Sequence, residues 1–325
     1  MGNYSIRNYQ QADYQKWNAF IATAKNATFL FHRDFMDYHA DRFSDFSLMV
    51  YKGDDLIAVL PANTSGSIVI SHQGLTYGGL VLGAATKLME AIAIFRELLF
   101  HLYQLQKETV VLKVVPEIYH DLPSDEINYI LFLAEGRLMR RDTLSVIDLQ
   151  HPIGITSGRM EGVKKGIRQG LEIRETDDLK PFWNEILIPN LWDKHKTQPV
   201  HSLEEIQLLK TRFPKQIRQF DVVHQGRIVA GTTIFESNHV FHAQYISGNG
   251  QKNELGSVDF LYHHLLTAVF KDKKYFDFGI SNEAQGRKLN SGLLFWKESF
   301  GARTIVHDFY EVATAHYDKL DSIAL

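Results

Sequence analysis

Two neighbouring side chains at the end of one expected strand could take part in acid–base chemistry or in substrate binding. Gln244 and Tyr245 close the expected strand 239–246, directly before a loop rich in glycine and asparagine at 247–256. Acyl transfer to an amine needs a base for the amine proton, a donor for the tetrahedral oxyanion and an acid for the leaving group. The Tyr245 hydroxyl suits the acid or the oxyanion donor, and the Gln244 amide suits substrate binding. The alternative for Tyr245 is a side chain packed in a sheet.

Two basic residues of the second half could complete this chemistry. Lys297 lies on the expected helix 291–300, where its side chain supplies a positive charge. His195 lies in a polar segment between two expected helices, and a histidine can act as a base near neutral pH. The alternatives are a solvated helix lysine and an exposed loop histidine. The candidate catalytic residues are therefore Tyr245, Lys297 and His195.

Polar residues also follow the expected buried strand 275–279, and strand ends are where α/β folds place their ligands. We expect Asp277, inside that strand, to be a buried acid bonded to backbone. A glycine turn after Tyr77 could shape an acceptor groove. The candidate substrate contacts are Gln244, Asn282, Glu283, Asn290, Tyr77 and Arg168.

The composition limits the classes of function. The chain has 325 residues, a formal net charge of −3 and no cysteine. A protein that binds nucleic acid through phosphate contacts usually has a basic surplus, so DNA is not expected as a partner and tRNA is disfavoured. Thiolate nucleophiles, disulfides and cysteine-based zinc sites are excluded. The adjacent His263 and His264 point in different directions on a helix, so no metal site is expected.

The order of expected elements repeats in the two halves of the chain. Each half reads as a strand, two helices, a three-strand meander, a loop, a long helix, a buried strand, a shorter helix and closing strands. The long helices are expected at 85–106 and 257–270. Ser202 and Glu205 have the spacing of a capping box before the helix 203–212, and Asp34 is expected to cap a helix of the first half. We predict a mixed α/β fold made of two tandem copies.

The segment between the copies is basic and rich in glycine. Its expected helix, 159–169, carries Lys164, Lys165 and Arg168 and is weakened by interior glycines. These cations would bind an anionic acceptor, or they form a solvated face. We therefore predict an N-terminal domain at 1–150, a linker helix segment at 151–170 and a C-terminal domain at 171–325.

Motifs from residue 219 onward resemble a known group of enzymes. The most specific is an aromatic residue followed by lysine and then Phe-Gly, at Trp296, Lys297, Phe300 and Gly301. The other matching runs are 226–232, 242–245 and 275–281, and in the first half Tyr77-Gly78-Gly79. They are similar to the tandem acyltransferases related to the Fem peptidoglycan aminoacyltransferases and the BioF2-like acetyltransferases. This resemblance implies two copies of the N-acetyltransferase (GNAT) fold, each a mixed sheet flanked by helices.

The resemblance also implies a donor and an acceptor. The donor would be acetyl-CoA or another acyl-CoA, with its pyrophosphate on Gly256 and Ser257 at the start of a long helix and near Lys297. The run 253–258 keeps Gly256 but departs from the usual phosphate signature at its first and last positions. The acceptor would be an amine of a sugar or peptide precursor of a cell-envelope polymer, such as a nucleotide-linked sugar. Apart from the resemblance, the sequence shows no signal-peptide pattern and no apolar run of the length that spans a bilayer, so we expect a cytoplasmic protein.

Two other functions remain open at this point. One is a Fem-like aminoacyltransferase that uses aminoacyl-tRNA, although the large helical-hairpin insertion of some Fem enzymes is missing. The other is a duplicated GNAT fold that binds a ligand or a protein without catalysis. In the first half the corresponding run, 80–85, fits the phosphate signature only in its second part. The incomplete signature in both copies supports this last alternative.

Overall fold

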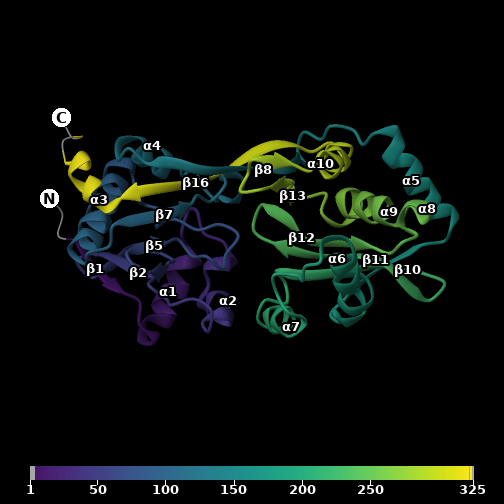
Figure 1. Ribbon diagram of the computed structural model, residues 1–325, viewed down its shortest axis with the longest axis horizontal. Helices are drawn as coiled ribbons and strands as arrows, with labels where there is room; N and C mark the ends of the chain where they lie inside the picture. Colours follow the sequence, from purple (N-terminus) through teal and green to yellow (C-terminus); the bar gives the residue numbers. More distant parts are fainter. Residues whose placement is uncertain (1–3, 322, 324–325) are drawn as a thin grey trace. The chain divides into compact units, whose positions relative to one another are not determined.

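A computed structural model describes residues 4–321 and 323 of the chain, with the side chain of His195 left out (Figure 1). The chain forms two compact units, Met1–Asp142 with Val306–Leu325, and Thr143–Ile305. It leaves the first unit within the long strand β8 (Arg137–Asp148) and returns within β16 (Arg303–Ala313). Each unit combines a mixed sheet with helices, which confirms the expected α/β fold.

The first unit has two sheets and one long helix. Its strands and helices are β1 (Tyr4–Asn8), α1 (Tyr14–Ile21), α2 (Arg33–Met36), β2 (Leu48–Lys52), β3 (Asp55–Leu60), β4 (Asn63–Ser65), β5 (Ile68–Ile70), β6 (Val81–Leu82), α3 (Leu88–Gln104), β7 (Thr109–Lys113) and α4 (Glu126–Leu133). The strand orders are β1-β2-β3-β6 and β4-β5-β7-β16. Apolar residues of α3 form one core with residues of β2, β3 and β7.

The second unit is built on one sheet with the strand order β8-β13-β12-β11-β10-β9. Its elements after β8 are α5 (Ser157–Arg168), β9 (Glu172–Thr176), the π-helix η5 (Phe182–Leu187), α6 (Ile188–His195), α7 (Leu203–Arg212), β10 (Ile217–His224), β11 (Arg227–Glu236), β12 (Val240–Gly248), α8 (Lys252–Leu255), α9 (Ser257–His264), the π-helix η6 (Leu265–Val269), β13 (Tyr275–Ile280), β14 (Asn282–Glu283), β15 (Lys288–Leu289) and α10 (Ser291–Glu298). All neighbouring pairs from β8 to β9 are antiparallel except β12 and β13, which run parallel.

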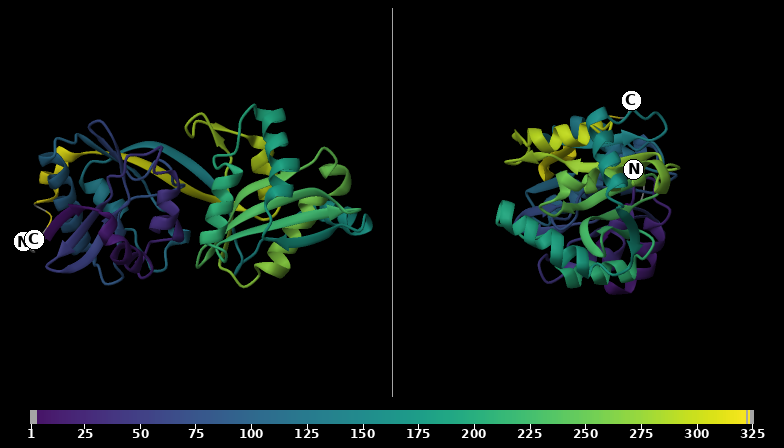
Figure 2. Two further views of the ribbon diagram at one scale, coloured as in Figure 1. Left: turned by 90° about the horizontal axis from the view of Figure 1, so that it is seen from below. Right: turned by 90° about the vertical axis from the view of Figure 1, so that its right-hand side faces the viewer.

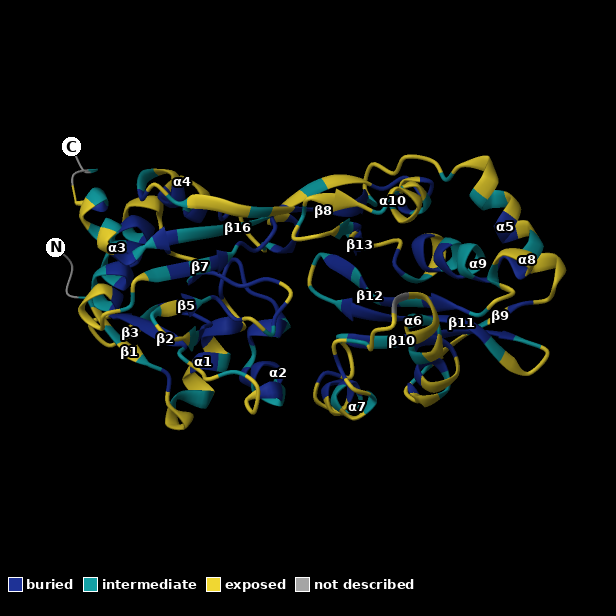
Figure 3. Cartoon of the chain, viewed as in Figure 1, coloured by how far each residue is buried: buried dark blue, intermediate teal, exposed yellow. Residues whose placement is uncertain are grey.

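Helices cover both faces of this sheet. Helices α9 and α10 lie over one face, and α6 and α7 lie over the other, which is turned toward the viewer in the left view of Figure 2. Large aromatic residues of β12 and β13, Phe241, Phe276 and Phe278, are buried in one core with Leu261 and Tyr262 of α9. The residue next to each of these aromatic residues in its strand points to the opposite face, toward α6 and α7, because side chains alternate between the faces of a sheet. Figure 3 shows the buried residues concentrated in the strands and on the inner sides of the helices.

Local sequence signals predict most of these elements. The side chain of Ser202 accepts a hydrogen bond from the N–H of Glu205, and the capping box before α7 is confirmed. The helix expected at 257–270 is α-helical only to His264 and continues as a π-helix to Val269. The expected cap at Asp34 is wrong, because α2 begins at Arg33 and its N-cap is His32.

The compact units begin and end at other residues than the predicted domains. Residues 306–325 group with the first unit, and residues 143–150 group with the second. The domains 1–150 and 171–325 stay a prediction about where the two copies begin and end in the sequence. Among the described residues, no helix is both long enough and apolar enough to cross a membrane.

Candidate active site

The two parallel strands of the second unit pair over a short stretch and then separate. Residues 240–242 of β12 pair with residues 275–277 of β13, and the described pairing covers only these three positions. β12 continues to Gly248, whereas β13 ends at Ile280. We call residues 243–248 of β12 and 277–280 of β13 the fork. Backbone groups without a strand partner need another hydrogen-bond partner, so a fork in a sheet can accept a ligand.

Gln244 is the extra residue of a β-bulge inside the fork. Tyr245 pairs with Thr233 of β11 and Ala243 pairs with Ile234, so no residue stands opposite Gln244. A bulge bends a strand and redirects its side chains. The Gln244 Oε1 atom is buried, and no described residue donates a hydrogen bond to it. A buried oxygen of this kind costs about 1–3 kcal/mol, so it favours a ligand or water that supplies an N–H or O–H.

A carboxylate and an imidazole join the two strands at their last pair. Asp277 is only 1% exposed, and its Oδ2 accepts a hydrogen bond from Nδ1 of His242 at 2.9 Å. Its Oδ1 accepts a second bond from the backbone N–H of Gly279 at 2.7 Å. The expectation that Asp277 is a buried acid bonded to backbone is confirmed. Sequence reasoning did not assign a role to His242, since only the register of β12 against β13 brings it to Asp277.

Lys297 is buried directly behind the end of β13. Its side chain is 2% exposed, and Nζ donates to the carbonyl oxygens of Gly279 at 2.9 Å and Ile280 at 2.7 Å. Burial lowers the pKa of Lys297 to about 8, and the charge of Asp277 opposes this shift. The structure therefore brings Lys297 to the fork, as a cation bound to backbone carbonyls and not as a solvated helix lysine.

Tyr245 packs on the face of the sheet that α6 and α7 cover. Its ring lies edge-on to Trp183 of η5, with 4.8 Å between the ring centroids. Its hydroxyl lies 2.6 Å from Nδ1 of His201 and accepts a bond from the backbone N–H of the same residue at 3.2 Å. Burial is the main reason why the pKa of Tyr245 is raised to about 12. The hydroxyl is thus protonated at neutral pH and can donate a hydrogen bond. His201, like His242, was not found from the sequence.

Three predicted substrate contacts surround the small hairpin of β14 and β15. Oδ1 of Asn282 accepts hydrogen bonds from the backbone N–H of Thr143 at 2.7 Å and from its hydroxyl at 2.9 Å. Glu283 forms an ion pair with Lys288 at 3.1 Å. Asn290 caps α10 by accepting a bond from the N–H of Leu293 at 3.0 Å. These bonds order the hairpin and the start of α10, and a role in substrate binding stays a prediction.

The start of α9 is covered by α5, and this bears on the predicted CoA site. A Cβ atom placed on Gly256 would lie 2.0 Å from the carbonyl oxygen of Gly162 in α5, and Gly256 has a φ of +66°. Ser257 is fully buried, and its Oγ has no hydrogen-bond partner among the described residues. Helix α5 therefore lies against the start of α9 on the side where Gly256 would carry a Cβ atom. The assignment of Gly256 and Ser257 to a cofactor stays a prediction.

The basic residues of α5 lie on its exposed side. Arg168 forms an ion pair with Glu161 at 3.0 Å, and Lys164 lies 3.8 Å from the same carboxylate. Arg168 is 62% exposed and Lys164 is 64% exposed, so these are solvated pairs. Their binding of an anionic acceptor stays a prediction.

Two other predicted site residues are not brought to the fork by any described contact. Tyr77 belongs to the first unit, where it is 3% exposed and its hydroxyl donates to Oγ1 of Thr28 at 3.0 Å. Its ring packs against Tyr119 with 4.7 Å between the centroids. His195 is the last residue of α6, so the expected loop position is wrong, and its side chain lies outside the described residues.

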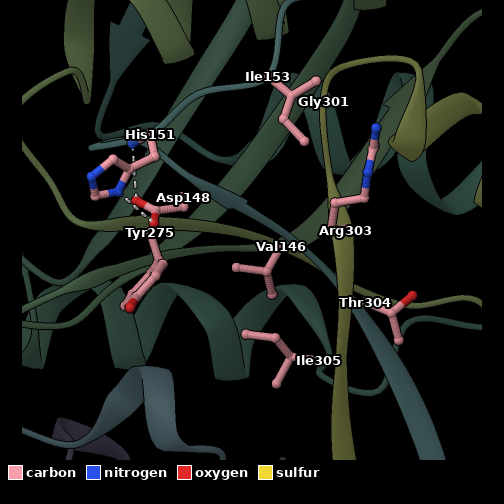
Figure 4. A pocket seen from close by; sticks show the side chains of 9 residues that line it. All are labelled: Val146, Asp148, His151, Ile153, Tyr275, Gly301, Arg303, Thr304 and Ile305. Carbon is pink, nitrogen blue, oxygen red and sulfur yellow. Dashed lines mark hydrogen bonds and ion pairs between the residues drawn. The ribbon is translucent and has the colours of Figure 1, made fainter.

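A pocket opens near the start of β13, on the face of the sheet to which Asp277 also belongs. Asp277 pairs with Val146 of β8, and Tyr275 pairs with Asp148, so these four side chains share one face. A pocket with a volume of about 230 Å³ is lined by Val146, Asp148, His151, Ile153, Tyr275, Gly301, Arg303, Thr304 and Ile305. Figure 4 shows the apolar side chains of Val146 and Ile305 between the His151–Asp148 pair and Arg303. Apolar side chains therefore line the middle of the pocket, and charged side chains lie on two sides of it.

Comparison with solved structures was made over the whole chain. FemX matches with a TM-score of 0.68 and 9% sequence identity, over 98% of this chain and 99% of that chain. The L-PGS of Bacillus licheniformis matches with a TM-score of 0.59 and 12% identity, over 92% and 90% of the two chains. The C-terminal domain of a putative lysylphosphatidylglycerol synthetase from Agrobacterium fabrum matches with a TM-score of 0.55 and 12% identity, over 81% and 83%.

No family model matches the sequence, and no curated protein matches it significantly. The likeness is thus one of fold, carried by structures that share about one residue in ten with this chain. It covers both compact units of the chain.

Proposed function

On the premise that this chain has the FemX-related tandem GNAT-like fold, we propose that it is an acyltransferase. It transfers an acyl group from an activated ester or thioester to an amine at the fork of the second unit. The acceptor is an amine-bearing sugar or peptide precursor of a cell-envelope polymer, and the reaction takes place in the cytoplasm. The acceptor class comes from the resemblance of the C-terminal motifs to Fem-related enzymes.

The fork is the observation that carries this proposal. The Gln244 Oε1 atom is buried and has no donor among the described residues, at the place where β12 leaves β13. An amine or amide N–H of a substrate would supply the missing hydrogen bond. Lys297 holds a buried positive charge at the end of β13, 2.7 Å from the carbonyl oxygen of Ile280. Two of its three N–H groups bond to carbonyls, and the third can donate to an oxyanion that forms in the fork.

The pocket near the start of β13 suits a small part of the acceptor. Its volume of about 230 Å³ is below the roughly 300–1,000 Å³ of common ligand sites, so it fits one ring or a short chain. Val146 and Ile305 would pack against carbon atoms of that group. Arg303 would pair with a carboxylate or phosphate on the acceptor.

A second candidate function concerns the donor. The sequence predicts acyl-CoA, but α5 lies close to the start of α9, where a Cβ atom on Gly256 would be 2.0 Å from the carbonyl oxygen of Gly162. This contact favours a donor that is not held at those amides, and aminoacyl-tRNA is such a donor. The name of one structural neighbour, a lysylphosphatidylglycerol synthetase, also points to a transferred aminoacyl group.

The test is transfer of a radiolabel to an amine. Purified protein is incubated with radiolabelled acetyl-CoA or with charged tRNA, each with a panel of amino sugars, nucleotide-linked sugars and peptide precursors. We expect one donor to label one acceptor class, and Gln244→Leu to lower kcat/KM by about tenfold, the effect of one lost hydrogen bond of about 1.4 kcal/mol. Gln251→Leu, at an exposed residue before α8, is the matched control.

The outcomes separate the three functions. Label from acetyl-CoA supports the acyl-CoA enzyme, and label from charged tRNA alone supports the aminoacyltransferase. A protein that labels no amine with either donor contradicts both and favours a binding module. Equal activity of Gln244→Leu and Gln251→Leu would contradict the assignment of the reaction to the fork.

A further inference from the structure

We propose that His242, oriented by Asp277, is the general base that takes the proton of the acceptor amine. This inference rests on the proposed acyl transfer and names a catalytic residue for it. The hydrogen bond between His242 and Asp277 lies at the last pair of β12 and β13, where the fork begins.

The carboxylate fixes which nitrogen of the imidazole is available. Asp277 accepts a hydrogen bond, so Nδ1 of His242 carries the proton and Nε2 presents a lone pair. No described residue forms a hydrogen bond or an ion pair with Nε2. The side chain of His242 is 14% exposed, which leaves it shielded from bulk water but reachable by a small group.

The end of β13, where the strand is irregular and the backbone turns at Gly279, lies against the imidazole. Gly279 has a φ of +71°, and a Cβ atom there would lie 3.2 Å from Cε1 of His242 and 4.0 Å from Nε2. Glycine therefore lets the turn lie against the ring without a clash. The N–H of the same residue bonds to Asp277, and its carbonyl oxygen accepts a bond from Lys297. Asp277 and Gly279 of β13 thus contact the ring, and Lys297 of α10 bonds to the backbone of Gly279.

The charged groups around the imidazole favour this role. Asp277 is its hydrogen-bond partner on β13, and Lys297 of α10 lies behind the same turn. On the other side, β11 contributes the apolar Phe235, the strand partner of His242. A carboxylate bonded to Nδ1 stabilises the imidazolium that forms when Nε2 accepts a proton, and this is the use of aspartate beside a catalytic histidine.

The reaction step balances without any further reactant. The lone pair of the neutral amine attacks the acyl carbon of the donor ester or thioester, and a C–N bond forms. His242 Nε2 accepts a proton from the amine nitrogen as the tetrahedral intermediate develops. The bond from the acyl carbon to the leaving oxygen or sulfur then breaks with its electron pair, and the leaving group takes the proton from the imidazolium. The products are an amide and the free alcohol or thiol.

A second His–Asp pair in the same unit lacks these features. His151 lies 3.1 Å from Asp148, three residues before it in the chain, and its side chain is 82% exposed. An ion pair between exposed residues that are close in the sequence fixes the orientation of the ring only weakly. The buried, turn-supported pair at the fork is therefore the one suited to proton transfer.

The test combines kinetics with a measurement that needs no substrate. With the donor and acceptor found above, we expect His242→Gln to lower kcat by about 10²–10⁴-fold, the usual worth of a general base. The dependence of kcat on pH should be weaker in this variant, because glutamine cannot take up the proton of the amine. His224→Gln, on β10, should retain both the rate and the pH profile.

Nitrogen NMR of the imidazole separates a positioning role of Asp277 from a structural one. In the wild type the neutral ring of His242 should carry its proton on Nδ1. In Asp277→Asn the ring should lose this single tautomer, and kcat should fall while the circular dichroism spectrum stays that of the wild type. A wild type whose neutral His242 carries its proton on Nε2 would overturn the inference.

The failure of this inference differs from the failure of the proposed function. A wild type that transfers no acyl group overturns both. An active wild type with a fully active His242→Gln variant, and an unchanged pH profile, overturns only the assignment of His242. Loss of activity in His242→Gln with wild-type folding, together with the expected tautomer, supports it.

Discussion

At the scale of single residues, Lys297 has a role that its sequence position does not reveal. An aromatic-lysine motif on an amphipathic helix predicts either a cation for a ligand or a solvated side chain. In the structure the ammonium group instead holds the carbonyl oxygens of Gly279 and Ile280. Those carbonyls belong to the turn that contacts His242, so a buried cation and a glycine turn together shape the fork.

We predict that Lys297→Met lowers kcat by about 10²-fold, because the donor for the oxyanion is lost. Comparison of this variant with the wild type also tests the lowered pKa of Lys297. Folding lowers this pKa from 10.5 to about 8, so the unfolded chain binds more protons between these pH values. The free energy of unfolding of the wild type, relative to the variant, should therefore rise by up to roughly 3 kcal/mol as the pH increases from 8 to 10.5.

Urea unfolding at several pH values measures this difference. Lys215→Met, at an exposed residue, is the control and should follow the wild type at every pH. If the free energy of unfolding of the wild type fell relative to that of Lys297→Met as the pH increased from 8 to 10.5, the lowered pKa of the buried Lys297 would be contradicted.

The sequence was informative for residues that act within one segment and uninformative for pairs from different strands. Gln244 and Tyr245 could be identified because they close a strand before a glycine-rich loop. The partners of these side chains depend on strand register, which a single sequence does not encode locally. His242 and Asp277 are separated by 35 positions and meet only through three parallel pairs.

At the scale of elements, the glycines of α5 are contact residues. From the sequence they only weaken a helix, but a Cβ on Gly162 would lie 2.1 Å from Oδ2 of Asp259, and one on Gly166 would lie 2.7 Å from Cβ of Phe260. Small residues let two helices approach closely, and here they allow α5 to lie on α9. The helix expected at 159–169 is thus confirmed as α5, and it also packs against the residues predicted to bind phosphate.

We predict that Gly162→Ala destabilises the chain by about 1–3 kcal/mol, because the methyl group overpacks the contact with α9. It would also displace Asp259, which pairs with Arg159 at 3.1 Å. Gly158→Ala lies in the same helix with nothing within 4 Å of the new Cβ, so it should stabilise by up to about 1 kcal/mol.

Thermal unfolding of the two variants tests whether Gly162→Ala destabilises the chain and Gly158→Ala stabilises it. A stabilising effect of alanine at both positions would mean that α5 does not pack on α9.

At the scale of the whole molecule, the sequence predicts the architecture better than the division into units. The same order of strands and helices occurs in both halves of the sequence, because the local propensities and the spacing of hydrophobic residues are repeated. This order indicates two similar α/β units. Which strand completes which sheet is a matter of distant pairing. The last strand, β16, pairs with β7 through Val312 and Val110, so the end of the chain joins the first unit.

The pairing of β16 with a strand of the first unit leads to our last prediction. Val312 is 1% exposed in the core of the first unit, although it lies in the C-terminal half of the sequence. Val312→Asp buries an unpaired carboxylate at a cost of several kcal/mol. Hydrogen exchange measured by mass spectrometry should therefore become faster in the peptides of β2, β3 and α3. Val222→Asp on β10, equally buried in the second unit, should have its effect in the peptides of β11, β12 and α9. If Val312→Asp instead loosened only the peptides of β10 to β13, residues 306–325 would belong to the second unit and the chain would divide in simple sequence order.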